Sequence, residues 1–318
     1  MLQDITKSFR KVIAGVDDLN RQRFLRLREC RCEIILLCQQ IYDFDLSQFR
    51  EKWDHLQGML VNGQLEAETE KISEEICYCI EKRNWIRLAE LLLYLDDVIK
   101  KVLKQECTAM QDWHGSIWQK NLSALKEKDA GLADLIQASE KRSGIEIHPG
   151  GTEGCKILIH NKEKTVQLFS ADNPWLVSAE YFRYSQAKEY SDIYLWGFGG
   201  GFLTGWVQKK FPQASIHVYL YNLDIFYAVL YNICLDDILA DSKTKFTYDP
   251  TALKFIQAVH NIDADEKCGI FMDFVEQQFF APWAAELKQY IARCGDLNKK
   301  HLERTVSVGQ NIFRTIGE

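Results

Sequence analysis

The stretch from Ser191 to Ile225, SDIYLWGFGGGFLTGWVQKKFPQASIHVYLYNLDI, decides the fold class that this sequence predicts. Its apolar run at residues 193–196 indicates a buried strand. Residues 202–211 are typical of a helix that ends before Pro212, and residues 216–221 of a second strand. A strand, a glycine loop, a helix and a second strand form the first half of a Rossmann-type unit. The stretch therefore predicts a parallel α/β domain.

The glycine loop is the first candidate ligand-binding segment. Its residues are Gly197, Phe198, Gly199, Gly200 and Gly201. Glycines at this density indicate a positive φ or a close approach to the backbone, and a loop that opens a helix offers free N–H groups to an anion. The spacing fits G-x-G-x-G but not G-x-G-x-x-G, because Phe202 stands at the third glycine position. The alternative is a tight turn that binds nothing.

Strands and helices continue to alternate after this stretch. We expect a helix at 223–239, a strand at 245–248, a helix at 251–260 and a strand at 268–274. Such alternation predicts a parallel sheet with a crevice at the carboxyl ends of its strands, where Asn222, Asp249 and Asp273 would join Gly199. Each acid has a simpler alternative: Asp249 can cap a helix that starts at Pro250, and Asp273 can be an ordinary residue at a strand end.

The proline distribution divides the chain. All five prolines follow residue 148, and the region before them shows helical periodicity, with Asn84 as an expected N-cap. We therefore predict a helical domain at 1–148, with four to six helices. A Rossmann-like α/β domain is predicted at 149–290, beginning with a β-hairpin at 155–160 and 165–169, and a helical tail or linker at 291–318.

Composition excludes several functions. The net charge of −6 is spread evenly, since residues 1–150 hold 22 Lys and Arg against 25 Asp and Glu, which argues against a nucleic-acid-binding module. No apolar run is long enough to span a bilayer, so we expect a cytoplasmic protein that does not contact a membrane. The ten cysteines form no zinc motif and are expected to be reduced and mostly buried.

Two charged motifs have plain interpretations. Five arginines scatter around a helix rather than forming one stripe, which favours a solvated surface or an interface; they are Arg21, Arg23, Arg26, Arg28 and Arg31. Asp263 and Asp265 have the spacing of an Asp-x-Asp metal motif, but they fall in a polar turn where solvation is the default. We predict no metal site and no catalytic residue from the sequence.

Several short motifs in one order resemble the N-terminal part of the motility accessory factor (Maf) glycosyltransferases of flagellated bacteria. They are a hairpin, Ser170 with Asn173-Pro174, the segment 197–202, and the run 220–226, LYNLDIF. The resemblance covers about residues 155–260. Leu220 and Tyr221 replace the Glu-Pro of the family pattern, which removes the acid best suited to hold a ribose. The family's transferase domain has no counterpart in this chain.

The resemblance implies an accessory or N-terminal portion of a Maf-like enzyme. Such a chain would bind a CMP-sugar or the protein acceptor, flagellin, in glycosylation with nonulosonic acids, without turnover of its own. Two alternatives stay open: a class I methyltransferase that uses S-adenosylmethionine at the Gly197 loop, and a non-catalytic scaffold whose helical half mediates assembly. The oligomeric state is open, and fold alone does not decide among these functions.

Overall fold

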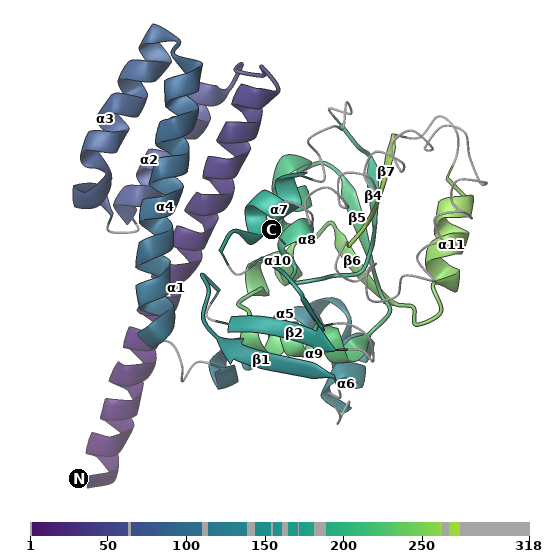
Figure 1. Ribbon diagram of the computed structural model, residues 1–318. Helices are drawn as coiled ribbons and strands as arrows, with labels where there is room; N and C mark the ends of the chain where they lie inside the picture. Colours follow the sequence, from purple (N-terminus) through teal and green to yellow (C-terminus); the bar gives the residue numbers. More distant parts are fainter. Residues whose placement is uncertain are drawn as a thin grey trace. The chain divides into compact units, whose positions relative to one another are not determined.

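The computed structural model describes residues 2–273 apart from 63–64, 110–113, 139–143, 154, 161–164, 171, 181–188 and 263–266 (Figure 1). The chain forms two compact units, Met1–Glu106 and Cys107–Glu318. The expected tail at 291–318, together with Asp263 and Asp265, lies outside the described residues.

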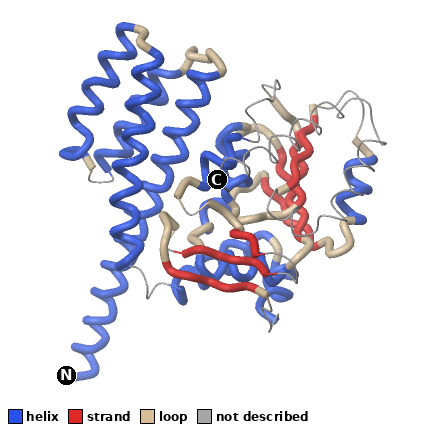
Figure 2. Tube along the Cα trace, in the orientation of Figure 1, coloured by secondary structure: helices blue, strands red, loops and turns tan. Residues whose placement is uncertain are grey.

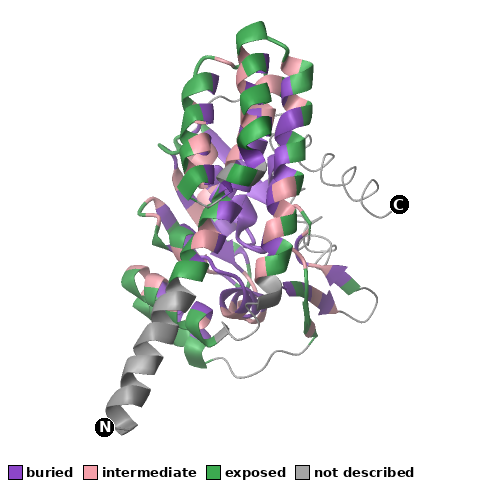
Figure 3. Cartoon of the chain, turned by 90° about the vertical axis from the view of Figure 1, so that its left-hand side faces the viewer, coloured by how far each residue is buried: buried purple, intermediate pink, exposed green. Residues whose placement is uncertain are grey.

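The first unit is helical, as the sequence predicts. It is built from α1 (Leu2–Tyr42), α2 (Phe49–Asn62), α3 (Glu66–Lys82) and α4 (Trp85–Ala109) (Figures 1 and 2). Asn84 caps α4, since its Oδ1 accepts a hydrogen bond from the N–H of Arg87 at 3.3 Å. Apolar residues at helical spacing form the core, and Figure 3 shows this buried face between the exposed outer faces.

The arginines of α1 do not all lie on a solvated surface, since three of the five are buried. Arg21, Arg28 and Arg31 are 7%, 1% and 0% exposed. Arg31 donates two hydrogen bonds to Asp96 of α4, from Nε to Oδ1 at 2.8 Å and from Nη2 to Oδ2 at 3.1 Å. Because a buried cation needs a hydrogen-bonded counter-charge, this pair joins α1 to α4 inside the core.

The second unit begins with two helices and an antiparallel sheet. The helices are α5 (His114–Lys128) and α6 (Ala130–Ala138). The sheet has the order β1-β2-β3, with β1 (Ile145–Pro149), β2 (Cys155–His160) and β3 (Thr165–Gln167). The antiparallel pairing of β2 with β3 confirms the hairpin, whereas β1 was not expected.

A four-stranded parallel sheet forms the centre of the second unit, as the sequence predicts for the part of the chain that is described. Its order is β6-β5-β4-β7, with β4 (Asp192–Trp196), β5 (Ser215–Leu220), β6 (Thr244–Tyr248) and β7 (Cys268–Met272). The helices are α7 (Pro174–Glu180), α8 (Phe202–Lys210), α9 (Leu223–Asn232), α10 (Asp236–Ala240) and α11 (Leu253–His260). Figure 1 shows α7, α8 and α10 on one side of this sheet and α11 on the other.

The expected helix at 223–239 is broken into α9 and α10, and Asn121 of α5 explains the break. Its Nδ2 donates to the carbonyls of Leu230 and Ile233 at 2.7 and 2.6 Å, and its Oδ1 accepts from the N–H of Leu235 at 2.9 Å. Trp118 of the same helix contacts Tyr227, with ring centroids 4.7 Å apart. Because α5 packs on α9 in this way, the boundary between the compact units falls well before residue 148.

Membrane-spanning helices are not found: across the described segments, no helix combines the length and the apolar character needed to cross a bilayer.

Candidate functional site

The candidate site lies at the carboxyl edge of the parallel sheet. The segments that follow the strands stay hydrogen-bonded there: Gly197 N–H donates to Tyr219 O at 2.9 Å, and Asp273 N–H donates to Trp196 O at 2.8 Å. The chain leaves β4 toward β5 on one side and returns to β7 on the other. Open α/β sheets bind their ligands outside the carboxyl ends of the strands, at the point where the strand order reverses in this way.

Gly199 and Asp273 meet at this edge of the sheet, between β4 and β7. Gly199 has φ +54°, and a Cβ at this position would overlap the carboxylate of Asp273. Glycine therefore suits this position for two reasons: a side chain would be strained by the positive φ, and its Cβ would have to push the carboxylate aside. The structure thus brings the first loop of the unit against the acid that ends β7.

The other glycines of the loop are explained by neighbouring aromatic rings. A Cβ at Gly200 would lie 2.7 Å from the ring of Phe169 and 2.8 Å from that of Phe202, and one at Gly201 would lie 2.9 Å from Phe198. Gly197 and Gly201 also have positive φ, +90° and +83°. All five loop residues are buried, so packing accounts for much of the glycine content without a ligand.

Two buried polar atoms next to the loop have no hydrogen-bond partner among the described residues. Thr204, in the first turn of α8, is 1% exposed and its Oγ1 is unsatisfied; Trp175 of α7 has an unsatisfied Nε1. The ring of Trp175 packs edge-on against Phe202, with centroids 5.2 Å apart. Buried polar groups without partners are uncommon, and here they lie on residues beside the start of α8. The sequence reasoning overlooked Phe169 and Trp175, because both come from segments before the glycine loop.

Asn222 and Asp249 are occupied in caps. Asn222 Oδ1 accepts hydrogen bonds from the N–H groups of Asp224 and Ile225, at 2.8 and 3.1 Å, at the start of α9. Asp249 is 2% exposed, and its Oδ2 accepts from the N–H of Phe255 in α11 at 2.9 Å. The simpler interpretation of Asp249 as a helix cap therefore describes its geometry, although α11 begins at Leu253 and not at Pro250.

Asp249 also affects its neighbour on β5. Burial, and secondarily the negative charge of Asp249, raise the pKa of the Tyr219 hydroxyl. Tyr219 therefore stays protonated at neutral pH, and its hydroxyl can donate a hydrogen bond. Of the eight candidate residues, Gly199 and Asp273 form the pair that joins the loop after β4 to the segment after β7.

Among the described residues, no group of three His, Cys, Asp or Glu side chains is arranged to hold a metal ion. Comparisons with protein-family models, with curated proteins and with solved structures found no match for this chain.

Proposed function

We propose that the α/β unit binds a nucleoside-containing ligand at the crevice between β4 and β7. The observation that carries this proposal is the contact between Gly199 and the carboxylate of Asp273 at the point where the strand order reverses. A carboxylate there can accept hydrogen bonds from ribose hydroxyls, while the N–H groups at the start of α8 suit an anionic part of the same ligand. The unsatisfied Oγ1 of Thr204 adds a further polar group beside that helix start.

The resemblance to the Maf family suggests a CMP-activated sugar as the ligand. In this proposal the chain is an accessory or N-terminal portion of such an enzyme, and it presents the nucleotide sugar, or the flagellin-like acceptor, to a transferase located elsewhere. Binding without turnover is consistent with the capping roles of Asn222 and Asp249, whose polar atoms are engaged in holding helices. The proposed setting is the cytoplasm.

A second candidate ligand is S-adenosylmethionine, and one observation favours it. The negative charge of Asp273 at the glycine loop disfavours a phosphate at the same point, whereas it would attract the cationic groups of S-adenosylmethionine. The strand order is equally compatible with this ligand. The non-catalytic scaffold remains the third function, and it requires neither ligand.

A thermal-shift titration distinguishes these functions. Cytidine monophosphate, a CMP-sugar, S-adenosylmethionine and S-adenosylhomocysteine are each added to the full chain. A ligand at about a hundred times its Kd should stabilise the protein by about 2.7 kcal/mol, which is a rise in Tm of roughly 5–10 °C.

The variants then locate the site. Asp273→Asn should reduce the shift, whereas Glu127→Gln, an exposed change on α5, should leave it unchanged. Stabilisation by S-adenosylmethionine alone would replace the CMP-sugar assignment, and no shift with any of the four compounds would leave the scaffold function.

A further inference from the structure

The antiparallel sheet of the second unit brings together a hydroxyl, an imidazole and a carboxylate on its exposed face. Thr165 Oγ1 on β3 lies 2.7 Å from Nδ1 of His160 on β2. The other ring nitrogen of His160, Nε2, lies 3.3 Å from Oε2 of Glu146 on β1. A hydroxyl that contacts an imidazole, which in turn contacts a carboxylate, is the arrangement by which proteins activate a weak nucleophile. None of these three residues belongs to the proposed nucleoside site.

The strand register places the three side chains on one face. Thr165 is paired with His160 across β2 and β3, and Glu146 is paired with Leu158, two residues before His160, across β1 and β2. Paired residues of antiparallel strands point to the same face, and so do residues two positions apart on one strand. The opposite face packs into the core through residues that are all buried: Cys155, Ile157, Ile159 and Val166. The three groups are therefore held by strands whose other face is fixed by packing.

The charge of Glu146 determines which nitrogen of His160 carries the proton. The Glu146 carboxylate accepts a hydrogen bond from Nε2 of His148 at 3.2 Å. This bond, and secondarily the charge of His160, lower the pKa of the carboxyl, so it is ionised at neutral pH. Nε2 of His160 is shielded from solvent and makes no aligned hydrogen bond within the described residues, so the nearby negative charge is what favours a proton there. Nδ1 is then the unprotonated nitrogen, and it accepts a hydrogen bond from the Thr165 hydroxyl.

We propose that Thr165 is a nucleophilic modification site, whose hydroxyl takes an acyl group from an activated ester or thioester. Thr165 Oγ1 attacks the carbonyl carbon and forms a new ester bond, while the bond from that carbon to the leaving alkoxide or thiolate breaks. Nδ1 of His160 takes the hydroxyl proton as general base and passes it to the leaving group. Glu146 is a positioning residue, because it acts through His160 and does not touch the donor. Thr165 is exposed, so a donor in solution can reach its hydroxyl.

Other threonine hydroxyls lie in different surroundings. Thr69 is buried, and its hydroxyl donates to the main-chain carbonyl of Leu65 at 2.7 Å. Thr251 is exposed like Thr165, but its hydroxyl contacts a carboxylate, Oδ1 of Asp249 at 3.5 Å. A carboxylate is a weaker base than an imidazole, so Thr251 is an internal control for an exposed hydroxyl without an activating base.

Acetylation of the full chain by p-nitrophenyl acetate, followed by peptide mass spectrometry, tests the proposal. We expect Thr165 to gain one acetyl group about 100-fold faster than Thr251, since a placed general base contributes at least about that factor. H160Q should slow the reaction at residue 165 by about 100-fold, T165V should abolish it, and T165S should keep it. E146Q should slow it by about 10-fold, less than H160Q, because the charge of Glu146 is partly exposed and screened.

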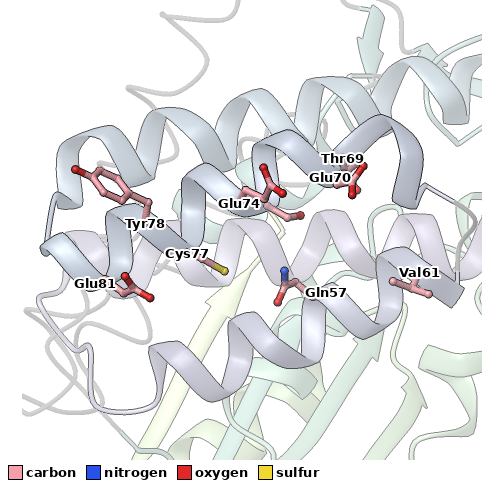
Figure 4. A pocket seen from close by; sticks show the side chains of 9 residues that line it. Gln57, Val61, Thr69, Glu70, Glu74, Cys77, Tyr78 and Glu81 are labelled. Atoms are coloured by element: carbon pink, nitrogen blue, oxygen red, sulfur yellow. The ribbon is translucent and has the colours of Figure 1, made fainter.

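Matched controls come from exposed residues of the helical unit. Glu74→Gln changes a carboxylate on the wall of the groove between α2 and α3, which Figure 4 shows, and His55→Gln changes an exposed imidazole. Both should leave the acetylation of Thr165 within about twofold of its original rate, because distant sites act independently. Free imidazole should restore much of the rate in H160A, which a purely structural role of His160 would not allow. Circular dichroism and the Tm of each variant establish that the fold is retained.

Four results would overturn the proposal. They are acetylation of Thr165 no faster than that of Thr251, an unchanged rate in H160Q, an acetyl group that stays on His160 without reaching Thr165, and no rescue of folded H160A by imidazole. Each would leave the contacts among Glu146, His160 and Thr165 as surface hydrogen bonding that stabilises the sheet alone.

Discussion

The contact between Gly199 and Asp273 can be measured by replacing the glycine. In Gly199→Ala the alanine must adopt a backbone φ of +54°. This conformation costs on the order of 1–2 kcal/mol for residues other than glycine. The alanine Cβ must also displace the carboxylate of Asp273, which is the end of a flexible side chain, so this displacement should add only about 1 kcal/mol, the low end of overpacking costs. We therefore expect the free energy of unfolding to fall by about 2–3 kcal/mol.

A double-mutant cycle separates the two costs. Asp273→Ala removes the three atoms nearest to the new Cβ, so in that background Gly199→Ala should cost only the backbone strain, about 1–2 kcal/mol. The coupling of about 1 kcal/mol is measured by urea unfolding of the full chain, followed by circular dichroism and tryptophan fluorescence. Gly115→Ala is the control, because nothing lies within 4 Å of its added Cβ and the helical position should gain about 0.5 kcal/mol. An equal cost of Gly199→Ala in both backgrounds would refute the described contact.

Three further predictions concern buried polar groups. Arg31→Met should destabilise the helical unit by about 3 kcal/mol in urea unfolding because the buried carboxylate of Asp96 loses two charged hydrogen bonds, whereas Arg31→Met with Asp96→Leu should recover most of that loss. Asn121→Ala should cost about 2–4 kcal/mol, since three main-chain groups lose their partner, and hydrogen exchange should rise selectively around Leu235; uniform exchange would contradict this role. Burial, and secondarily the charge of Glu153, raise the pKa of Cys155 to about 12, so its alkylation at pH 8 should be slower than that of Cys77 and should increase about tenfold per pH unit. The unfolded Cys155 thiol loses its proton from about pH 9, whereas the folded one keeps it. The free energy of unfolding should therefore fall as the pH rises above 9.

The sequence predicted the elements whose signals are local. The apolar runs that became β4 and β5, the helix that ends before Pro212 and the cap at Asn84 depend on residues a few positions apart, and all four are confirmed. The alternation of strands and helices also predicts that the four strands run parallel and therefore end at the same edge of the sheet, as they do.

What the sequence missed depends on distant partners. Arg31 is indistinguishable from its exposed neighbours until Asp96 is placed beside it, 65 residues away. Strand β1, IEIHP, alternates apolar and polar residues over only four positions and has mostly exposed side chains, so its pairing with β2 is what defines it. Gly200 suggested an open loop for a ligand, but the ring of Phe169 fills the space beside it.

The three hydrogen bonds of Asn121 determine where this protein can be cut for expression. A fragment that starts at residue 149 would retain every strand of the parallel sheet but lose the side chain that holds the α9–α10 junction. It would also uncover the ring of Tyr227. A fragment that starts at Cys107 retains both contacts, and it is the shorter piece we expect to be well behaved in solution.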